Sequence, residues 1–164
     1  MTHRLELGAL ADIYFSQGKL DLAAEEYRAA YDRDPNDDDI RAHYGNCLSR
    51  QGKPQEALPL LAAVCAKNPR HDYGYTLMSY AETQAATDKI DEAIAMWRQV
   101  LAMYGYPRAR VQFADLLLKR KEYAEARKVL EEVIHDAPFA TKFERKREAI
   151  WFNRAKAALR SIPK

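Results

Sequence analysis

Histidines, cysteines and paired acids are the residues of this sequence that could take part in catalysis or metal binding. The four histidines, His3, His43, His71 and His135, lie far apart, and none has the spacing to cysteines or acids that a metal site needs. Two pairs of adjacent glutamates fall in helical stretches, where neighbouring side chains point about 100° apart, so neither pair forms an acid–base couple. The glycines stand singly, without a phosphate-binding loop. We therefore expect a protein that is not an enzyme and binds no metal or cofactor.

The composition is that of a soluble helical protein. Hydrophobic residues make up 48% of the 164 residues and charged residues 30%, which suffices for a core, and a net charge of +2 favours neither nucleic acid nor membrane as a partner of the whole chain. Cys47 and Cys65 match no redox motif and are expected as packed, reduced thiols. No apolar run approaches a membrane span. We expect a cytoplasmic protein, or the cytoplasmic soluble part of a membrane-anchored one.

Small residues recur along the chain at a nearly constant interval. Ala23, Ala57, Ala93 and Ala126 are separated by 34, 36 and 33 residues. A period of this length is typical of stacked helix arrays. The longer second interval indicates about two inserted residues, placed most simply in the loop 70–74.

Helical patterns and turn residues divide the chain into helix pairs. Short connections predict that the two helices of each pair are antiparallel neighbours. Gly45 is expected to permit the close approach of a neighbouring helix. The expected organisation is one domain, 1–164, with repeats at about 4–37, 38–73, 74–106 and 107–140 and a capping helix at about 141–160. That last helix is expected to begin with a capping box at Thr141 and Glu144. Its expected apolar stripe consists of Phe143, Ile150, Trp151, Ala155, Ala158 and Leu159.

Several positions resemble the tetratricopeptide repeat, a helix pair with a large residue, Leu, a small residue and Tyr in its first helix, and Ala, an aromatic residue, Ala and Pro in its second. The first repeat carries the match at Leu7, Leu10, Ala11, Tyr14, Gly18, Ala23, Tyr27, Ala30 and Pro35. The later repeats keep part of it, including Gly45, Leu48, Ala57, Leu77, Ala81, Trp97, Ala114, Leu117, Leu130 and Pro138. The resemblance implies an all-α fold, a right-handed superhelical α-solenoid of antiparallel helix pairs, with about nine helices.

The resemblance also implies that the first helix of each pair lines a concave groove that binds a partner protein. The groove positions in this sequence are Leu5, Asp12, Phe15, Ala42, His43, Asn46, Arg50, Tyr75, Met78, Ser79, Glu82, Arg108, Val111, Gln112, Asp115 and Lys119. This mixed lining suits an extended peptide or an amphipathic helix. The alternative for Phe15 and Met78 is packing between adjacent first helices.

One subclass of the family grips a C-terminal carboxylate with Lys, Asn and Arg. Here Asn46 matches, but Gly8 and Asp12 replace the first Lys and Asn, and Glu82 adds a second acid. We therefore predict that this chain does not bind carboxylate tails.

The last 26 residues carry eight basic and two acidic residues, a net charge of +6. Arg145, Lys146, Lys156 and Arg160 mark a candidate basic surface, and Trp151 and Phe152 accompany it. The simpler interpretation is the solvated outer face of a capping helix, and contact with an anionic membrane is the alternative.

Two functions remain. We favour a scaffold that binds a protein partner in its groove, with no nucleic acid involved. The alternative is an assembly module that forms homo-oligomers or sits at a membrane, as the similarity to divergent bacterial arrays suggests.

Overall fold

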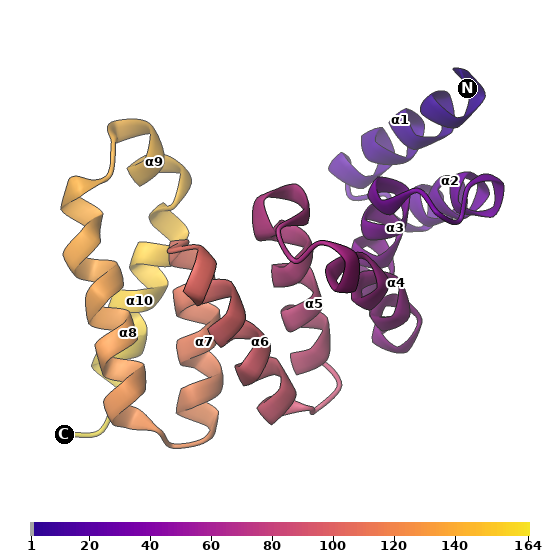
Figure 1. The fold of residues 1–164 in the computed structure, drawn as a ribbon. Coiled ribbons are helices and arrows are strands. Elements are labelled where there is room, and N and C mark those ends of the chain that lie inside the picture. Colours follow the sequence, from indigo (N-terminus) through magenta and orange to yellow (C-terminus); the bar gives the residue numbers. More distant parts are fainter. Residues whose placement is uncertain (1) are drawn as a thin grey trace. The chain divides into compact units, whose positions relative to one another are not determined.

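The computed structural model describes the backbone of residues 2–164 and the side chains of residues 8–164, so the expected roles of the Leu5 and Leu7 side chains lie outside the described residues. Every regular element in this range is a helix, which confirms the all-α prediction (Figure 1). The α-helices are α1 (Thr2–Ser16), α2 (Leu20–Arg33), α3 (Asp38–Arg50), α4 (Pro54–Lys67), α5 (Tyr75–Ala85), α6 (Ile90–Met103), α7 (Pro107–Lys119), α8 (Tyr123–Asp136), α9 (Lys142–Arg147) and α10 (Ala149–Ser161), with 3₁₀ turns η1 (His71–Gly74) and η2 (Ala137–Phe139).

The chain divides into two compact units, residues 1–93 and 94–164, and each is described here by itself. The boundary falls inside α6. The expectation of a single domain over 1–164 stays a prediction.

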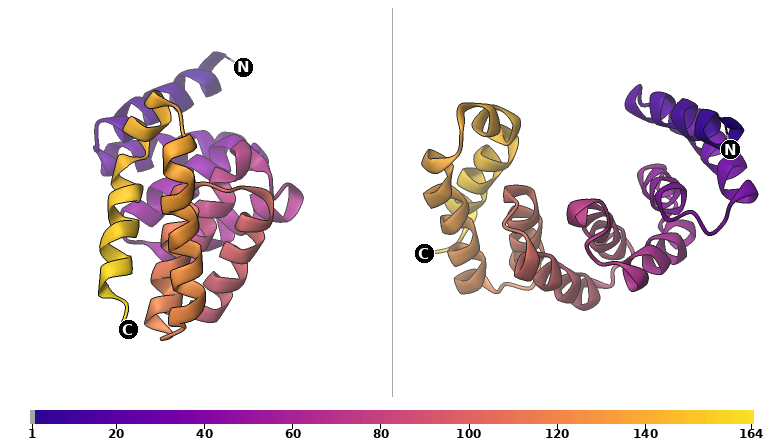
Figure 2. Two further views of the ribbon diagram at one scale, coloured as in Figure 1. Left: turned by 90° about the vertical axis from the view of Figure 1, so that its left-hand side faces the viewer. Right: turned by 45° about the horizontal axis from the view of Figure 1, so that its top comes forward.

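Close packing at small residues builds the first unit. α1 packs against α2 and α3 against α4, while α2 contacts α3 and α4 contacts α5 (Figure 2). Ala11 and Ala23 face this packing with no exposed surface, as does Ala57. A methyl group on Gly45 would lie 2.9 Å from Cγ of Leu61, so the predicted close approach at Gly45 is confirmed.

Left-handed residues end the first helix of each pair. Gly18 and Gly52 have φ of 73° and 77°, and Asp88 and Lys121 adopt φ of 60° at the corresponding turns. At three of these turns the amide of the next residue donates to a carbonyl five residues earlier: Lys19 to Tyr14, Lys53 to Leu48 and Glu122 to Leu117, each at 2.9 Å. This is the closing bond of a Schellman motif, which ends a helix and starts the return.

The loop expected to hold the inserted residues is irregular. Within η1, Asp72, Tyr73 and Gly74 have φ of 50°, 54° and 86°. His71 fixes this loop from both ring nitrogens: Nδ1 lies 2.6 Å from the Thr76 hydroxyl and Nε2 lies 2.7 Å from Oδ1 of Asp39. The loop is thereby tied to the first turn of α3.

In the second unit α7 pairs with α8, and α10 packs on both. The prediction of one continuous helix at 141–160 is wrong, because the helix breaks at Glu148 (φ −96°, ψ 5°) into α9 and α10. The capping box of Thr141 and Glu144 is confirmed.

The break also changes which side chains are buried. Phe143 and Ile150 were expected in the apolar stripe but are 71% and 60% exposed. Phe152, which lies outside the predicted stripe, is buried, and so is Ala155, which belongs to it. The predicted stripe is therefore wrong for Phe143 and Ile150 and correct for Ala155, while Trp151, Ala158 and Leu159 are half-buried.

Candidate functional site

Two predicted groove residues, Asp12 of α1 and His43 of α3, form a polar cluster with Tyr27 of α2. The buried Tyr27 of α2 donates its hydroxyl to Oδ1 of Asp12 at 2.5 Å, and Nδ1 of His43 lies 3.3 Å from the same oxygen. The Tyr27 and His43 rings meet edge to face at 6.0 Å. Burial, followed by the hydrogen bond to Asp12, raises the pKa of Tyr27 well above its usual value, so the phenol remains a donor.

Two adjoining cavities share Asp12, Tyr27 and His43, and we call them together the α1–α3 recess. Their volumes are about 360 Å³ and about 200 Å³. The other described residues that line them are Gly8, Ala9, Phe15, Asp37, Asp39, Ile40, Asn46 and Asp72, with no lysine or arginine among them. Four carboxylates and one histidine therefore give the recess a negative potential.

An aromatic ring and a cation flank the recess. Phe15 of α1 is half-buried, and the guanidinium of the exposed Arg50 on α3 lies over its ring, 5.2 Å from the centroid. The free part of this ring offers an apolar contact beside the acids. The contact with Arg50 of α3 supports the packing alternative for Phe15, and its role in binding stays a prediction.

Short polar contacts join α3 to α5. The Ser79 hydroxyl donates to Oδ1 of Asn46 at 3.3 Å, and the hydroxyls of Ser49 and Thr83 lie 2.8 Å apart. These bonds set the register of two neighbouring first helices. Asn46 thus has a structural partner as well as a place in the recess.

The predicted groove residues of α5 differ in their exposure. Tyr75 is 43% exposed, whereas Met78 has no exposed surface. Burial of Met78 supports the packing alternative for that side chain. Glu82 is half-buried.

The five predicted groove residues of the second unit lie on α7, where Val111 has no exposed surface, and α10 contacts one of the other four. Nη2 of Arg154 donates to Oδ2 of Asp115 at 2.8 Å, and the same guanidinium lies 4.8 Å from the centre of the Trp151 ring. Burial raises the pKa of Asp115, with Arg154 acting in the opposite direction. Arg108 and Gln112 are half-buried and Lys119 is exposed.

The four residues of the candidate basic surface are all exposed but lie on two helices. Arg145 and Lys146 belong to α9, and Lys156 and Arg160 to α10. The sequence pattern does not predict exposed apolar side chains next to Arg145 and Lys146.

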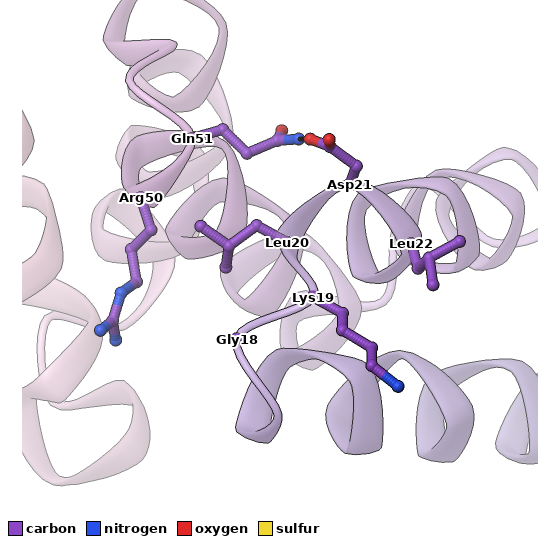
Figure 3. A pocket seen from close by; sticks show the side chains of 7 residues that line it. All are labelled: Gly18, Lys19, Leu20, Asp21, Leu22, Arg50 and Gln51. Carbon is purple, nitrogen blue, oxygen red and sulfur yellow. Dashed lines mark hydrogen bonds between the residues drawn. The ribbon is translucent and has the colours of Figure 1, made fainter.

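Two further hollows lie elsewhere. An open hollow of about 540 Å³ lies between the interhelical turns of the first two pairs, where Nε2 of Gln51 donates to Asp21 at 2.7 Å (Figure 3). Of the predicted site residues only Arg50 lines it. In the second unit a cavity of about 350 Å³ is lined by residues of α7, α8, α9 and α10 together with η2.

Sequence reasoning did not foresee several recess residues. Tyr27 is a family packing position, yet its hydroxyl reaches the groove side. Asp37 accepts a hydrogen bond from the amide of Ile40 at 3.0 Å, as expected of a capping residue, and also lines the recess. Asp72 reaches it from the irregular loop, for which the sequence pattern offers no signal.

Among the side chains described, no three of His, Cys, Asp or Glu come together in a way that could hold a metal ion. Antiparallel helix pairs that meet at buried alanines, with polar recesses along their first helices, define a helical-repeat protein. A family model described as "Tetratricopeptide repeat" matches residues 14–79 and 84–145. The chain belongs to the tetratricopeptide repeat family.

Solved structures of the same fold cover nearly the whole chain. A tetratricopeptide repeat protein from Parabacteroides merdae matches with a TM-score of 0.72 and 17% identity over 99% of this chain, which spans 66% of that protein. MamA matches with a TM-score of 0.73 and 17% identity, covering 94% of this chain and 91% of MamA. PilF of Pseudomonas aeruginosa matches with a TM-score of 0.70 and 21% identity, covering 93% of this chain and 71% of PilF. A comparison with curated proteins found no match.

Tetratricopeptide repeat domains generally act as non-enzymatic scaffolds for protein–protein interaction. None of the helices in the described range has the length and apolarity needed to cross a membrane.

Proposed function

We propose that this protein binds a segment of a partner protein along its first helices, and that the α1–α3 recess takes a basic side chain of that segment. The observation that carries the proposal is the recess itself, a pair of cavities lined by four aspartates and no lysine or arginine among the described residues. Such a lining favours a cation and disfavours a C-terminal carboxylate.

The arrangement of donors and acceptors supports the same polarity. Tyr27 already donates to Asp12, which leaves the second oxygen of this carboxylate free to accept from a partner. Asp12 is 54% exposed, so an incoming ammonium or guanidinium group can reach it without moving the helices.

Apolar surface beside the recess supports a segment longer than one residue. Phe15 lines the recess, and the partly exposed Tyr75 begins α5 three residues after Asp72, which also lines it. Aromatic anchors next to a charged pocket are typical of peptide recognition. We propose that the partner segment places a large apolar residue within a few residues of its cation, and that all of 1–164 acts as one domain in this binding.

The recess can be tested with peptides selected from a displayed random library on the purified protein. We expect the selected peptides to combine Lys or Arg with a large apolar residue. The double substitution Asp12→Asn and Asp72→Asn should then weaken a selected peptide about tenfold, because two partly exposed charges are each worth up to about 1 kcal/mol. Asn at position 12 keeps an acceptor for Tyr27.

The matched control is Glu25→Gln, which removes an exposed acid of α2 that does not line the recess. Its affinity should equal that of the unchanged protein. Two results would contradict the proposal that the recess binds a cation. One is the selection of acidic peptides, and the other is a loss of affinity in Glu25→Gln as large as that in the double variant.

The natural partner can be sought by affinity capture from the source cell followed by mass spectrometry. Replacing His43, Asn46 and Tyr75 together by alanine should remove the captured protein. Capture that survives this triple substitution would exclude the first helices as the binding surface.

A further inference from the structure

Three large apolar side chains are exposed at one corner of the second unit, where η2, α9 and the start of α10 follow one another. Phe139 is 80% exposed, Phe143 71% and Ile150 60%. These are the only large hydrophobic residues of 94–164 that the structure leaves exposed. They fall within twelve residues of sequence, at the end of the unit where α9 lies (Figure 1).

Each of the two rings contacts a polar side chain. The guanidinium of Arg147 lies 5.6 Å from the centre of the Phe143 ring, and the Phe139 ring is tilted against that of His135 at 5.8 Å. Each ring is thus oriented by a polar neighbour and keeps most of its surface in water. Such exposure is unfavourable unless another surface covers it.

Cations surround these apolar groups. The six residues of α9 include Lys142, Arg145, Lys146 and Arg147. Arg147 donates to Glu148 at 3.0 Å, and Glu144 closes the capping box on Thr141.

For the other three, Lys142, Arg145 and Lys146, no ion pair with an acid occurs among the described side chains. From 139 to 150 the chain has four basic and two acidic residues. The corner therefore combines a net positive charge with exposed apolar groups.

We propose that this corner, formed by Phe139, Phe143 and Ile150 with Lys142, Arg145 and Lys146, attaches the protein to an anionic lipid surface. The apolar side chains enter the boundary between headgroups and acyl chains, while the unpaired cations contact phosphate and carboxylate groups. Charge complementarity selects this occupant. A neutral apolar partner would leave the three cations without negative charges to pair with. A purely acidic peptide would leave the two rings exposed to water.

The four residues of the candidate basic surface fall into two groups, one on α9 and one on α10. Arg145 and Lys146 lie beside the exposed apolar groups, whereas Lys156 and Arg160 lie on α10, beyond its buried residues Phe152 and Ala155. Lipid attachment through α9 therefore predicts unequal effects of substitutions that change the net charge equally.

The test is flotation of the full chain with phosphatidylcholine vesicles, with and without phosphatidylserine. We expect flotation only with phosphatidylserine, and less of it as salt is added, since salt screens the cations. Changing Lys142, Arg145 and Lys146 to Gln together should weaken binding roughly 100-fold, at about fivefold for each cation. The control triple, Lys156→Gln, Arg160→Gln and Lys164→Gln, should weaken it only a few-fold.

A second variant tests the apolar part. Phe143→Ser with Ile150→Ser leaves the charge unchanged and should reduce flotation at least tenfold, because two large side chains no longer enter the boundary region. Both side chains are exposed, so circular dichroism and Tm should show an unchanged fold.

Several results would overturn the proposal. One is failure of the unchanged protein to float with vesicles that contain phosphatidylserine. Another is an equal loss of vesicle binding in the α9 triple variant and in the control triple variant. If the apolar double variant instead converted a dimer into a monomer in sedimentation, with no vesicle binding, the corner would be an interface between copies of this chain. The peptide-binding recess lies in the other unit, so either proposal can fail alone.

Discussion

Two helical glycines give opposite expectations for the same substitution. Gly8 in α1 and Gly45 in α3 both lie inside helices. A methyl group at Gly8 would meet no atom within 4 Å, whereas one at Gly45 would lie 2.9 Å from Cγ and 3.0 Å from Cδ2 of Leu61 and 3.2 Å from Cβ of Leu60. Alanine should therefore stabilise the protein at Gly8 and destabilise it at Gly45.

The magnitudes follow from two opposing effects. Replacing Gly by Ala inside a helix gains about 0.5–1 kcal/mol, because the unfolded chain loses conformational freedom. At Gly8 this gain stands alone. At Gly45 the forced displacement of Leu61, which has no exposed surface, costs about 1–3 kcal/mol. We expect a net loss of about 1 kcal/mol at Gly45.

Thermal and denaturant unfolding of both variants measure this difference. For a chain of this size about 1 kcal/mol corresponds to a Tm change of about 2–4 °C, upward for Gly8→Ala and downward for Gly45→Ala. A double-mutant cycle with Leu61→Ala identifies the cause. Removing the Leu61 branch relieves the clash, so the two substitutions should be coupled by at least about 0.5 kcal/mol.

The reasoning would be refuted if Gly45→Ala were as stable as Gly8→Ala, since the close approach of α4 would then have no energetic consequence. Additive effects of Gly45→Ala and Leu61→Ala would locate the cost elsewhere in the helix.

Three further predictions concern stability and reactivity. Lys121→Gly should raise the free energy of unfolding by about 0.5–1 kcal/mol, measured in urea, because Lys121 has a φ of 60° that glycine adopts without strain. Burial raises the thiol pKa of Cys47 and Cys65 to about 11, so a disulfide reagent at pH 8 should modify them only as fast as the protein opens, and rapid labelling of folded protein would contradict this. The bidentate pair of Arg98 with Glu125, at 2.5 and 3.0 Å, lowers the pKa of Glu125. Its stabilisation, at most about 1 kcal/mol for an exposed pair, is present above the unfolded pKa of Glu and lost as pH falls through the lower folded value. Glu125→Gln should therefore lower Tm at pH 7 but not at pH 2.

The periodicity of the sequence was sufficient to predict the helix pairs, because each helix crossing requires a small residue at the same position of every repeat. Ala11 and Ala23 are twelve residues apart, and so are Gly45 and Ala57. That spacing is dictated by two helices crossing near a short turn. The same reasoning placed the irregular loop correctly between α4 and α5.

The last helix shows where such reasoning stops. Glutamate is not a residue type that breaks helices, so the pattern from Thr141 to Arg160 predicts one continuous helix. α10 packs against α7 and α8, and these contacts with residues distant in sequence leave no trace in the local pattern. Phe143 and Ile150 were therefore assigned to the wrong environment.

The recess shows a second limit. Asp12 and His43 could be named from their helix positions, but the hydroxyl of Tyr27 and the carboxylate of Asp72 join them through tertiary contacts. Side chains from a second helix and from an irregular loop carry no periodic signal. Only the folded arrangement of the helices brings them into one site.

The turns and the packing positions differ in how much chemical variety they accept. The left-handed turn positions are occupied by Gly18, Gly52, Asp88 and Lys121. The matching contact positions of the first helices hold only Ala11, Gly45, Ala81 and Ala114. A motif search based on turn glycines would find half of these repeats. A search for a small residue followed by alanine twelve positions later would find all four. Protein engineers can accordingly treat the turns as attachment points for probes or inserted peptides, and should leave the helix crossings unaltered.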